Sequence, residues 1–437
     1  MLVALGMIMS TDVLKTAPTV ALNAAPGQFV WLWIGGGVVS LIGALCYVEM
    51  ACAFPDAGGE YSFLSRAWGP RIGALYAWSR FAVMHTGWIA LMAHLLADYA
   101  SAIVPMGDSA RTLFALAVIT VLALINCLHV RLGFLTQALL VALVALGFGA
   151  VIVAGCVANP AIPAHGLTSE APHRLGVALI YVFLAYGGWS DMATLSAELR
   201  GGPRGMAWVT IGAIGLLMVL YIALNAGMAH GLGLAALAQS TAPGADVARA
   251  AFGPLGAELV VGVVVLSAVA SINSTLIVGA RITSAASRTM PVLHRFADWH
   301  STRGTPVAAV IAVAVCSGIL TVLAGLTGNG FGAMVDYMSP VYYVFILLGM
   351  GAAIRLRLRA GTHVFPVRTP LFPLFPLTFA GVAAVMLWWS LTDLGPGALA
   401  GAGVMIAGAV LERFAQRSSH EAAENQGNWW SQGGSNS

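Results

Sequence analysis

Long apolar runs separated by short polar stretches dominate this chain almost to its C-terminus. A helix needs about 20 consecutive apolar residues to cross the hydrocarbon core of a bilayer. Twelve segments of roughly this length occur, so the pattern predicts an all-α transmembrane protein with twelve helices. The expected ranges are Leu2–Leu22, Phe29–Ala53, Ile72–Val104, Leu113–His129, Leu132–Val157, Leu175–Leu199, Ala207–His230, Leu255–Ala285, Val307–Leu326, Gly332–Ile354, Leu371–Leu391 and Ala398–Phe414.

Two of these segments contain residues that interrupt a helix. Met9-Ser10-Thr11-Asp12 lies early in the first, and Ala185-Tyr186-Gly187-Gly188-Trp189-Ser190 lies in the middle of the sixth. A broken helix at bilayer depth frees backbone N–H and C=O groups, so it is tolerated only where it lines a cavity inside the protein. Paired breaks at corresponding points of two halves are typical of the substrate site of a secondary transporter.

Arginine positions predict how the spans are oriented. With the N-terminus in the cytoplasm, the outer side holds only Arg111, Arg174 and Arg249, whereas the cytoplasmic side holds sixteen arginines. Such an excess on the cytoplasmic side is the usual orientation signal. We therefore expect both termini to be cytoplasmic. The sixteen are Arg66, Arg71, Arg80, Arg131, Arg200, Arg204, Arg281, Arg288, Arg295, Arg303, Arg355, Arg357, Arg359, Arg368, Arg413 and Arg417.

Composition agrees with a membrane protein and argues against other classes. Hydrophobic residues make up 59% and charged residues 8% of the chain, whereas soluble domains carry about 25% charged residues. The net charge of +3 is too small and dispersed to suggest a nucleic-acid partner. No HExxH, GxSxG or P-loop motif and no Cys/His metal spacing occurs, so we expect no enzyme activity, metal or cofactor. Lys15 is the only lysine, and this bias toward arginine suggests a bacterial inner-membrane protein.

Three separated motifs occur in a fixed order along the chain. They are Gly43-Ala44-Leu45-Cys46-Tyr47-Val48-Glu49 with Phe54-Pro55 and Gly58-Gly59-Glu60-Tyr61, then Phe183-Leu184-Ala185-Tyr186-Gly187-Gly188-Trp189 with Glu198, then Arg281 to Arg288 with Met290-Pro291 and Thr305-Pro306. Together they resemble the amino acid–polyamine–organocation superfamily of permeases, over about residues 5 to 415.

The resemblance implies a LeuT-like fold, in which a 5+5 inverted repeat contains broken helices 1 and 6. Residues 1–157 would form the first repeat (helices 1–5) and residues 175–357 the second (helices 6–10). Residues 364–415 would add helices 11 and 12, and the polar residues 416–437 are expected to be a disordered tail.

The resemblance also implies which groups meet the substrate. Each broken helix offers free carbonyls at one half-helix end and free amides at the other, and the partial charges suit a small zwitterion. The substrate's amine would meet carbonyls near Ile8 and from Phe183 to Tyr186. Its carboxylate would meet amides from Ser10 to Asp12 and around Gly187 and Gly188, where glycine permits unusual dihedral angles. The full predicted set is Ile8, Ser10, Thr11, Asp12, Phe183, Ala185, Tyr186, Gly187, Gly188 and Asn273.

Some of these residues have a structural alternative. Phe183 and Tyr186 form a thin aromatic gate over the substrate or simply pack. Asn273 hydrogen-bonds to a neighbouring helix or touches the ligand. Outside the set, Glu49 is expected to clamp loop backbone, and Asp98 is expected to be solvated at the outer end of its helix.

The first break departs from the superfamily pattern. Many members carry Gly-X-Gly there, and this chain has Ser10-Thr11-Asp12. An ionised Asp12 that points inward would repel a substrate carboxylate, so three interpretations are open. Asp12 is protonated and couples transport to H⁺, or it binds a cationic amine, or it pairs with Lys15 one turn later. The pair is the simplest of the three.

A second departure concerns energy coupling. Some relatives place a lysine in the fifth span, in the position of a sodium ion, but the fifth span here contains no lysine. Exchange of one solute for another is thereby favoured. The sequence thus predicts a permease for amino acids or related amines that works by alternating access, as an exchanger or a proton-coupled symporter. The alternative is a transport-inactive membrane sensor on the same fold; the oligomeric state is not predicted.

Overall fold

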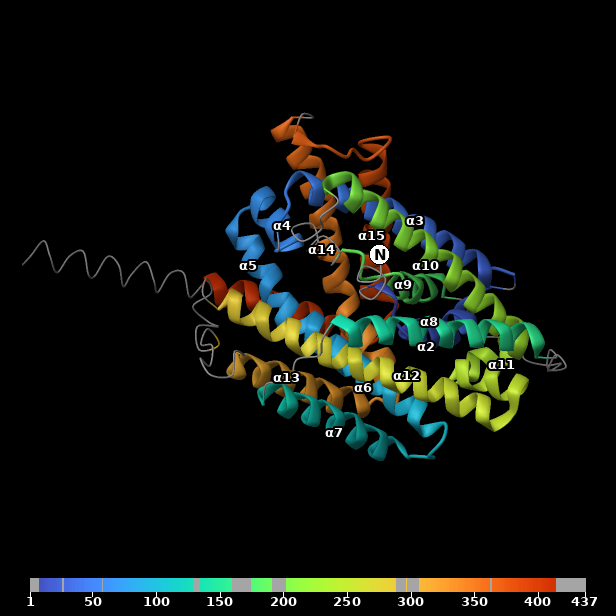
Figure 1. Cartoon of the computed structure of the whole chain (residues 1–437). Coiled ribbons are helices and arrows are strands. Elements are labelled where there is room, and N and C mark those ends of the chain that lie inside the picture. The colour runs from blue at the N-terminus through green and yellow to red at the C-terminus, as the bar shows by residue number, and fades with distance from the viewer. Residues whose placement is uncertain are drawn as a thin grey trace, which may run out of the picture.

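The computed structural model describes residues 8–25, 27–56, 58–128, 134–158, 174–190, 202–287, 296, 306–361 and 364–413. Within these ranges every regular element is a helix (Figure 1). The helices of the first half are α2 (Asp12–Asn23), α3 (Phe29–Ala53), α4 (Glu60–Trp68), α5 (Pro70–Ser79), the π-helical η1 (Arg80–His85), α6 (Thr86–Ser101), α7 (Asp108–Cys127) and α8 (Phe134–Val157). Those of the second half are α9 (Leu175–Ala185), α10 (Gly202–Leu232), α11 (Leu234–Gln239), α12 (Pro243–Ala286), α13 (Val307–Gly325), α14 (Gly330–Ala360), α15 (Leu374–Thr392) and a last helix over residues 396–413.

In the described part of the chain, nine stretches of helix are long and apolar enough to cross a membrane, so the protein is a multi-pass membrane protein. They are Phe29–Ala53, Pro70–Ser101, Asp108–Cys127, Leu139–Val157, Gly205–Leu232, Pro243–Ser284, Val307–Gly325, Gly330–Ala360 and Leu374–Thr392. The count of twelve spans and the 5+5 repeat stay predictions, because residues 1–7 and 191–201 of the first and sixth segments lie outside the described residues. The predicted C-terminal tail also lies outside them.

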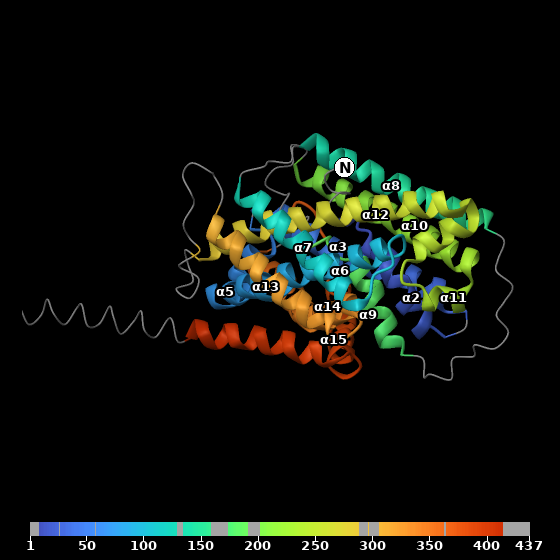
Figure 2. The ribbon, with the colours of Figure 1, turned by 90° about the horizontal axis from the view of Figure 1, so that it is seen from below.

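Helices α2 and α9, which flank the two predicted breaks, lie against each other inside the bundle. Around this pair, α10 packs against α3 and α8, and α12 packs against α6 and α8. Helices α7 and α13 lie side by side along the lower edge of the molecule in Figure 1 and so face the viewer in Figure 2, and α14 packs against α15. Large apolar side chains are exposed on the edge helices, as expected for a surface solvated by lipid: Leu113, Leu124, Ile311, Ile319 and Leu323.

Two of the long helices are irregular. The span Pro70–Ser101 contains the π-helical turn η1, which the sequence pattern did not predict. The carbonyl oxygen of Ala82 in this turn accepts hydrogen bonds from the hydroxyls of Thr86 (3.0 Å) and Tyr337 (2.9 Å). Helix α12 is kinked where Gly253 has a φ of 74°, directly before Pro254. Proline cannot donate a helical hydrogen bond, so the helix bends here. The kink lies directly before Leu255, where the eighth span was predicted to begin.

Glu49 acts as the clamp that the sequence predicted. Its carboxylate accepts a hydrogen bond from the Thr369 backbone N–H at 2.9 Å and pairs with Arg357 at 3.0 Å. The contact joins α3 to α14 and to the loop before α15.

Candidate functional site

Within the described residues, the chain is non-helical at both predicted places. Ile8 is helical, residues 9–11 are not, and α2 begins at Asp12. In the second half, α9 ends at Ala185 and residues 186–190 are non-helical. Because α2 packs against α9, the two interruptions come together in the bundle (Figures 1 and 2).

The first break is held by side chains from other helices. The Ser10 N–H donates to the Tyr221 hydroxyl at 3.2 Å, and this hydroxyl donates in turn to the Ser10 carbonyl oxygen at 3.2 Å. Tyr221 lies in α10 and is fully buried. On the other side, the Thr11 hydroxyl donates to Ser267 of α12 at 3.5 Å. Tyr221 thus replaces the helical hydrogen bonds that the break gives up.

Asp12 does not pair with Lys15, so the simplest of the three interpretations is wrong. The Asp12 side chain is buried, and neither of its oxygens has a hydrogen-bond partner among the described residues. The Lys15 ammonium instead contacts Asp98 at 2.7 Å and the Thr241 carbonyl oxygen at 2.8 Å. The close approach of α2 to α6 brings Asp98 within reach of Lys15. Lys15 therefore pairs with Asp98 and not with Asp12, three residues before it on the same helix.

Asp98 is not solvated as expected, because it has two cationic partners. Besides Lys15, Arg111 of α7 lies 3.0 Å from its carboxylate, and the Asp98 side chain is only 17% exposed. The carboxylate therefore joins α2, α6 and α7.

The second break is built from its own backbone. In a continuing helix the Gly187 N–H would donate to the Phe183 carbonyl, but here it donates to the Leu184 carbonyl at 2.9 Å. The Phe183 carbonyl thereby loses its helical donor. Gly188 has a φ of 86°, in the left-handed region that favours glycine. The unusual dihedral angle expected at both glycines is found at Gly188, whereas Gly187 is not among the positive-φ residues.

Two tyrosine rings connect the breaks. The ring of Tyr186 lies 5.4 Å from the ring of Tyr221, centroid to centroid, and the Tyr186 hydroxyl donates to the Trp33 carbonyl at 3.0 Å. Tyr186 is buried. In this conformation the Tyr186 side chain extends from the second break and packs against Tyr221 and α3.

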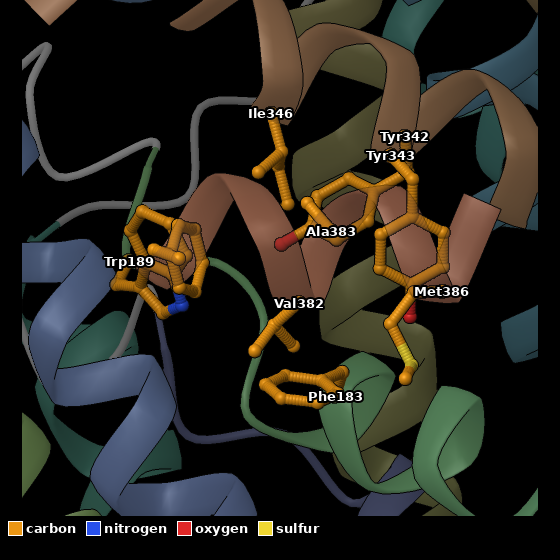
Figure 3. Close-up of a pocket in the computed structure, with 9 residues that line it drawn as sticks. Phe183, Trp189, Tyr342, Tyr343, Ile346, Val382, Ala383 and Met386 are labelled. Atoms are coloured by element: carbon orange, nitrogen blue, oxygen red, sulfur yellow. The ribbon is translucent and has the colours of Figure 1, made fainter. Parts of the chain in front are cut away.

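A small pocket lies beside the second break (Figure 3). Phe183 lines it from the end of α9, Trp189 from the break, Tyr342 and Tyr343 from α14, and Met386 from α15, together with further apolar residues. Its cavity volume of about 10 Å³ is room for about one water molecule, so no amino acid fits there in this conformation.

The remaining predicted residues are buried or engaged. The side chains of Ile8 and Ala185 are buried, which leaves only their backbone groups for a ligand. Asn273 lies in α12, and its side-chain oxygen accepts a hydrogen bond from Asn126 of α7 at 2.7 Å. The structure therefore shows the neighbouring-helix alternative for Asn273. Within the described residues, no group of three or more His, Cys, Asp or Glu side chains is placed to hold a metal ion.

Sequence reasoning missed Tyr221 and its contact with Ser10. The available signal was a tyrosine within the apolar seventh segment, four residues before Asn225. A buried tyrosine in a membrane span usually has a hydrogen-bond partner for its hydroxyl group. The apolar pattern of the sequence does not identify that partner.

Comparison with known proteins gives a consistent result. The family model described as amino acid permease matches residues 1–409. The b(0,+)-type amino acid transporter 1 of Mus musculus is 24% identical over 383 residues, which cover 85% of this chain and 77% of the relative. The Homo sapiens protein of the same name is 24% identical over 399 residues, 88% and 80% of the two chains. The large neutral amino acids transporter small subunit 2 of Oryctolagus cuniculus is 23% identical over 403 residues, 89% and 74% of the two chains.

Proposed function

The chain belongs to the amino acid permease family, within the amino acid–polyamine–organocation superfamily, and we propose that it moves amino acids or related amines by alternating access. Its relatives are transporters and not enzymes. The proposal places the substrate between the two helix breaks. It also places the chain in a bacterial inner membrane, with twelve spans, a 5+5 inverted repeat and both termini in the cytoplasm.

The observation that carries the proposal is the meeting of two opposite helix ends. Helix α2 presents its first amides at Asp12 and Val13, and Thr11 before them gives no side-chain cap. Helix α9 presents its last carbonyls, among them that of Phe183. The partial positive charge of the first end and the partial negative charge of the second suit the carboxylate and the amine of a zwitterion.

Polar contacts at the proposed outer side support a closed outer entrance. Lys15 binds Asp98 and the Thr241 carbonyl, which joins α2 to α6 and to the segment before α12. Next to it, the Gly244 N–H donates to the Tyr99 hydroxyl at 3.4 Å. Opening toward the outside would separate these elements, so these contacts would break and re-form in each transport cycle.

Solute exchange is the favoured mode of coupling. The fifth segment contains no lysine to carry a proton. An exchanger is expected to take up labelled substrate only into vesicles that contain unlabelled substrate.

Reconstituted vesicles test the function. Proteoliposomes that contain the purified protein would be loaded with a mixture of unlabelled amino acids and amines. Uptake of each labelled compound into these vesicles would then be measured. Uptake above protein-free vesicles that depends on internal substrate is expected. Uptake into empty vesicles that follows an imposed proton gradient would favour a symporter. No uptake of any compound by folded protein would favour the transport-inactive sensor.

A further inference from the structure

The Asp12 carboxyl group is a buried acid at the first break, and the donors near it are the Ser10 hydroxyl and the backbone N–H groups of Asp12 and Val13. Asp12 is 1% exposed, and both its carboxyl oxygens are without a hydrogen-bond partner in the described part of the chain. An unpaired charge in such a place is costly, and a cation or a set of N–H donors removes the cost. The question is whether the protein itself provides them.

The donors on α10 are engaged elsewhere. The Tyr221 hydroxyl gives its proton to the Ser10 carbonyl oxygen. The Asn225 side-chain amide donates to the Tyr221 carbonyl oxygen at 2.9 Å. Asn225 is fully buried and its own side-chain oxygen is also without a partner in the described structure. Neither Tyr221 nor the Asn225 amide of α10 therefore serves as a donor to Asp12.

The nearest cation along the chain is engaged as well. Lys15 contacts Asp98 and the Thr241 carbonyl, at the outer side of the bundle. The first turn of α2 offers Asp12 only the partial charge of a helix N-terminus, about half a unit. The protein thus leaves most of the Asp12 charge for something else to neutralise.

We infer that Asp12 binds a cationic group on the substrate side chain, and so makes the site prefer amino acids with a terminal amine over neutral ones of the same length. This inference rests on the proposed function, because it places the substrate at the first break. Once Asp12 is paired with such a cation, it no longer repels the substrate carboxylate that the amides of the same break are proposed to bind.

Lysine and norleucine form a suitable pair of probes, because norleucine is lysine without its terminal amine. Uptake of each labelled compound into proteoliposomes would be measured for the wild type. A hydrogen bond to a charged group contributes about 1.5–3 kcal/mol, so a preference for lysine of roughly tenfold or more in uptake efficiency is expected. Equal uptake of the two compounds would overturn the inference and leave the proposed function intact. If no amino acid in the wider mixture is taken up, the proposed function itself fails.

Substitutions at Asp12 assign the preference to this residue. Asp12→Asn is expected to lose the preference for lysine over norleucine, because it removes the charge that pairs with the lysine side-chain ammonium group. Asp12→Glu keeps the charge but moves it by one methylene group, so it is expected to show a weakened preference for lysine. A matched control is Asp336→Asn in α14, since Asp336 already accepts a hydrogen bond from the Gly395 N–H at 3.0 Å.

The outcomes separate a binding role from a structural one. Equal loss of lysine and norleucine uptake in Asp12→Asn would show that Asp12 only supports the fold, and would contradict the inference. If Asp12→Asn is not recovered as folded protein, the wild type and Asp12→Glu decide. A preference for lysine that is present in the wild type and weakened in Asp12→Glu supports a direct contact, and a preference that Asp12→Glu leaves unchanged does not.

Discussion

The two helix breaks reach similar interruptions by different means. The first contains no glycine, and Tyr221 of a distant helix supplies both hydrogen bonds to Ser10. The second uses its own backbone, with Gly188 at a φ of 86° and the Gly187 N–H turned to the Leu184 carbonyl. The first break is therefore supported by its surroundings and the second by its local sequence.

This difference predicts how each break responds to substitution. Changes at the second break should act through steric conflict within the same segment. Changes at the first should act through partners on α10, α12 and α6, many residues away in the sequence.

Gly187→Leu should abolish substrate binding while folded protein is still recovered in detergent. A Cβ atom on Gly187 would lie 2.9 Å from the Leu184 carbonyl oxygen, closer than real Cβ contacts allow, and the backbone of the break would have to move. Ligand-induced change in the thermal unfolding midpoint measures the binding. Gly149→Leu is the control, because a Cβ there meets nothing within 4 Å. Wild-type binding by Gly187→Leu would move the site away from the second break.

Tyr221→Phe should weaken transport and lower stability, because it leaves the Ser10 N–H and carbonyl without their partner. An unsatisfied buried polar group costs about 1–3 kcal/mol. Tyr337→Phe is the matched control, since it also removes a tyrosine hydroxyl bond, to Ala82, but lies away from both breaks. Exchange rates and unfolding midpoints of the two variants would be compared. Equal losses of exchange in both would mean that Tyr221 has no special relation to the first break.

A double-mutant cycle should show that Lys15 is coupled to Asp98 and not to Asp12. Lys15→Met and Asp98→Asn are expected to be non-additive in unfolding free energy, by about 0.5–3 kcal/mol, because each removes the same ion pair. Lys15→Met combined with Asp12→Asn is expected to be additive within about 0.5 kcal/mol. Chemical unfolding in detergent measures both cycles. If Lys15→Met instead recovers the stability lost in Asp12→Asn, Lys15 is paired with Asp12, contrary to the structure.

The position of the second break could be predicted from the sequence, whereas the residue that stabilises the first break, Tyr221, could not. Two adjacent glycines inside an apolar segment are a local signal, and Gly188 has the positive φ that such a residue permits. The Tyr221–Ser10 contact spans 211 positions, and no periodicity along the chain encodes it. A pattern of apolar residues shows that Tyr221 is buried in a span, but it does not show which helix faces it.

The predictions for the Asp12–Lys15 pair and for a solvated Asp98 were wrong for the same physical reason. The i,i+3 spacing of Asp12 and Lys15 is a local rule, and it competes with every acid that packing brings near. Asp98 wins this competition because the first turn of α2 lies close to the last turn of α6, a fact that only the tertiary structure supplies. For Glu49 the sequence predicted the kind of contact, a clamp on loop backbone, but not its partners, because Thr369 and Arg357 lie more than 300 positions away.

The smallest perturbation tests the orientation of the two breaks. In the proposed topology, α2 runs outward from the first break and α9 runs inward to the second, so the two breaks are related by inversion. Single cysteines in place of Gly201 and Arg359 should react with a membrane-impermeant thiol reagent only from the cytoplasm, and one in place of Ser169 only from outside. A background without Cys46, Cys52, Cys127, Cys156 and Cys316 is needed, since all five are free where the structure describes them. Labelling should leave exchange within about twofold of the unlabelled protein, because substitutions away from packed sites change stability by only about 0.5 kcal/mol. Reaction of the Ser169 variant from the cytoplasm alone would invert the orientation of both breaks, and the end of α2 would then face the cytoplasm.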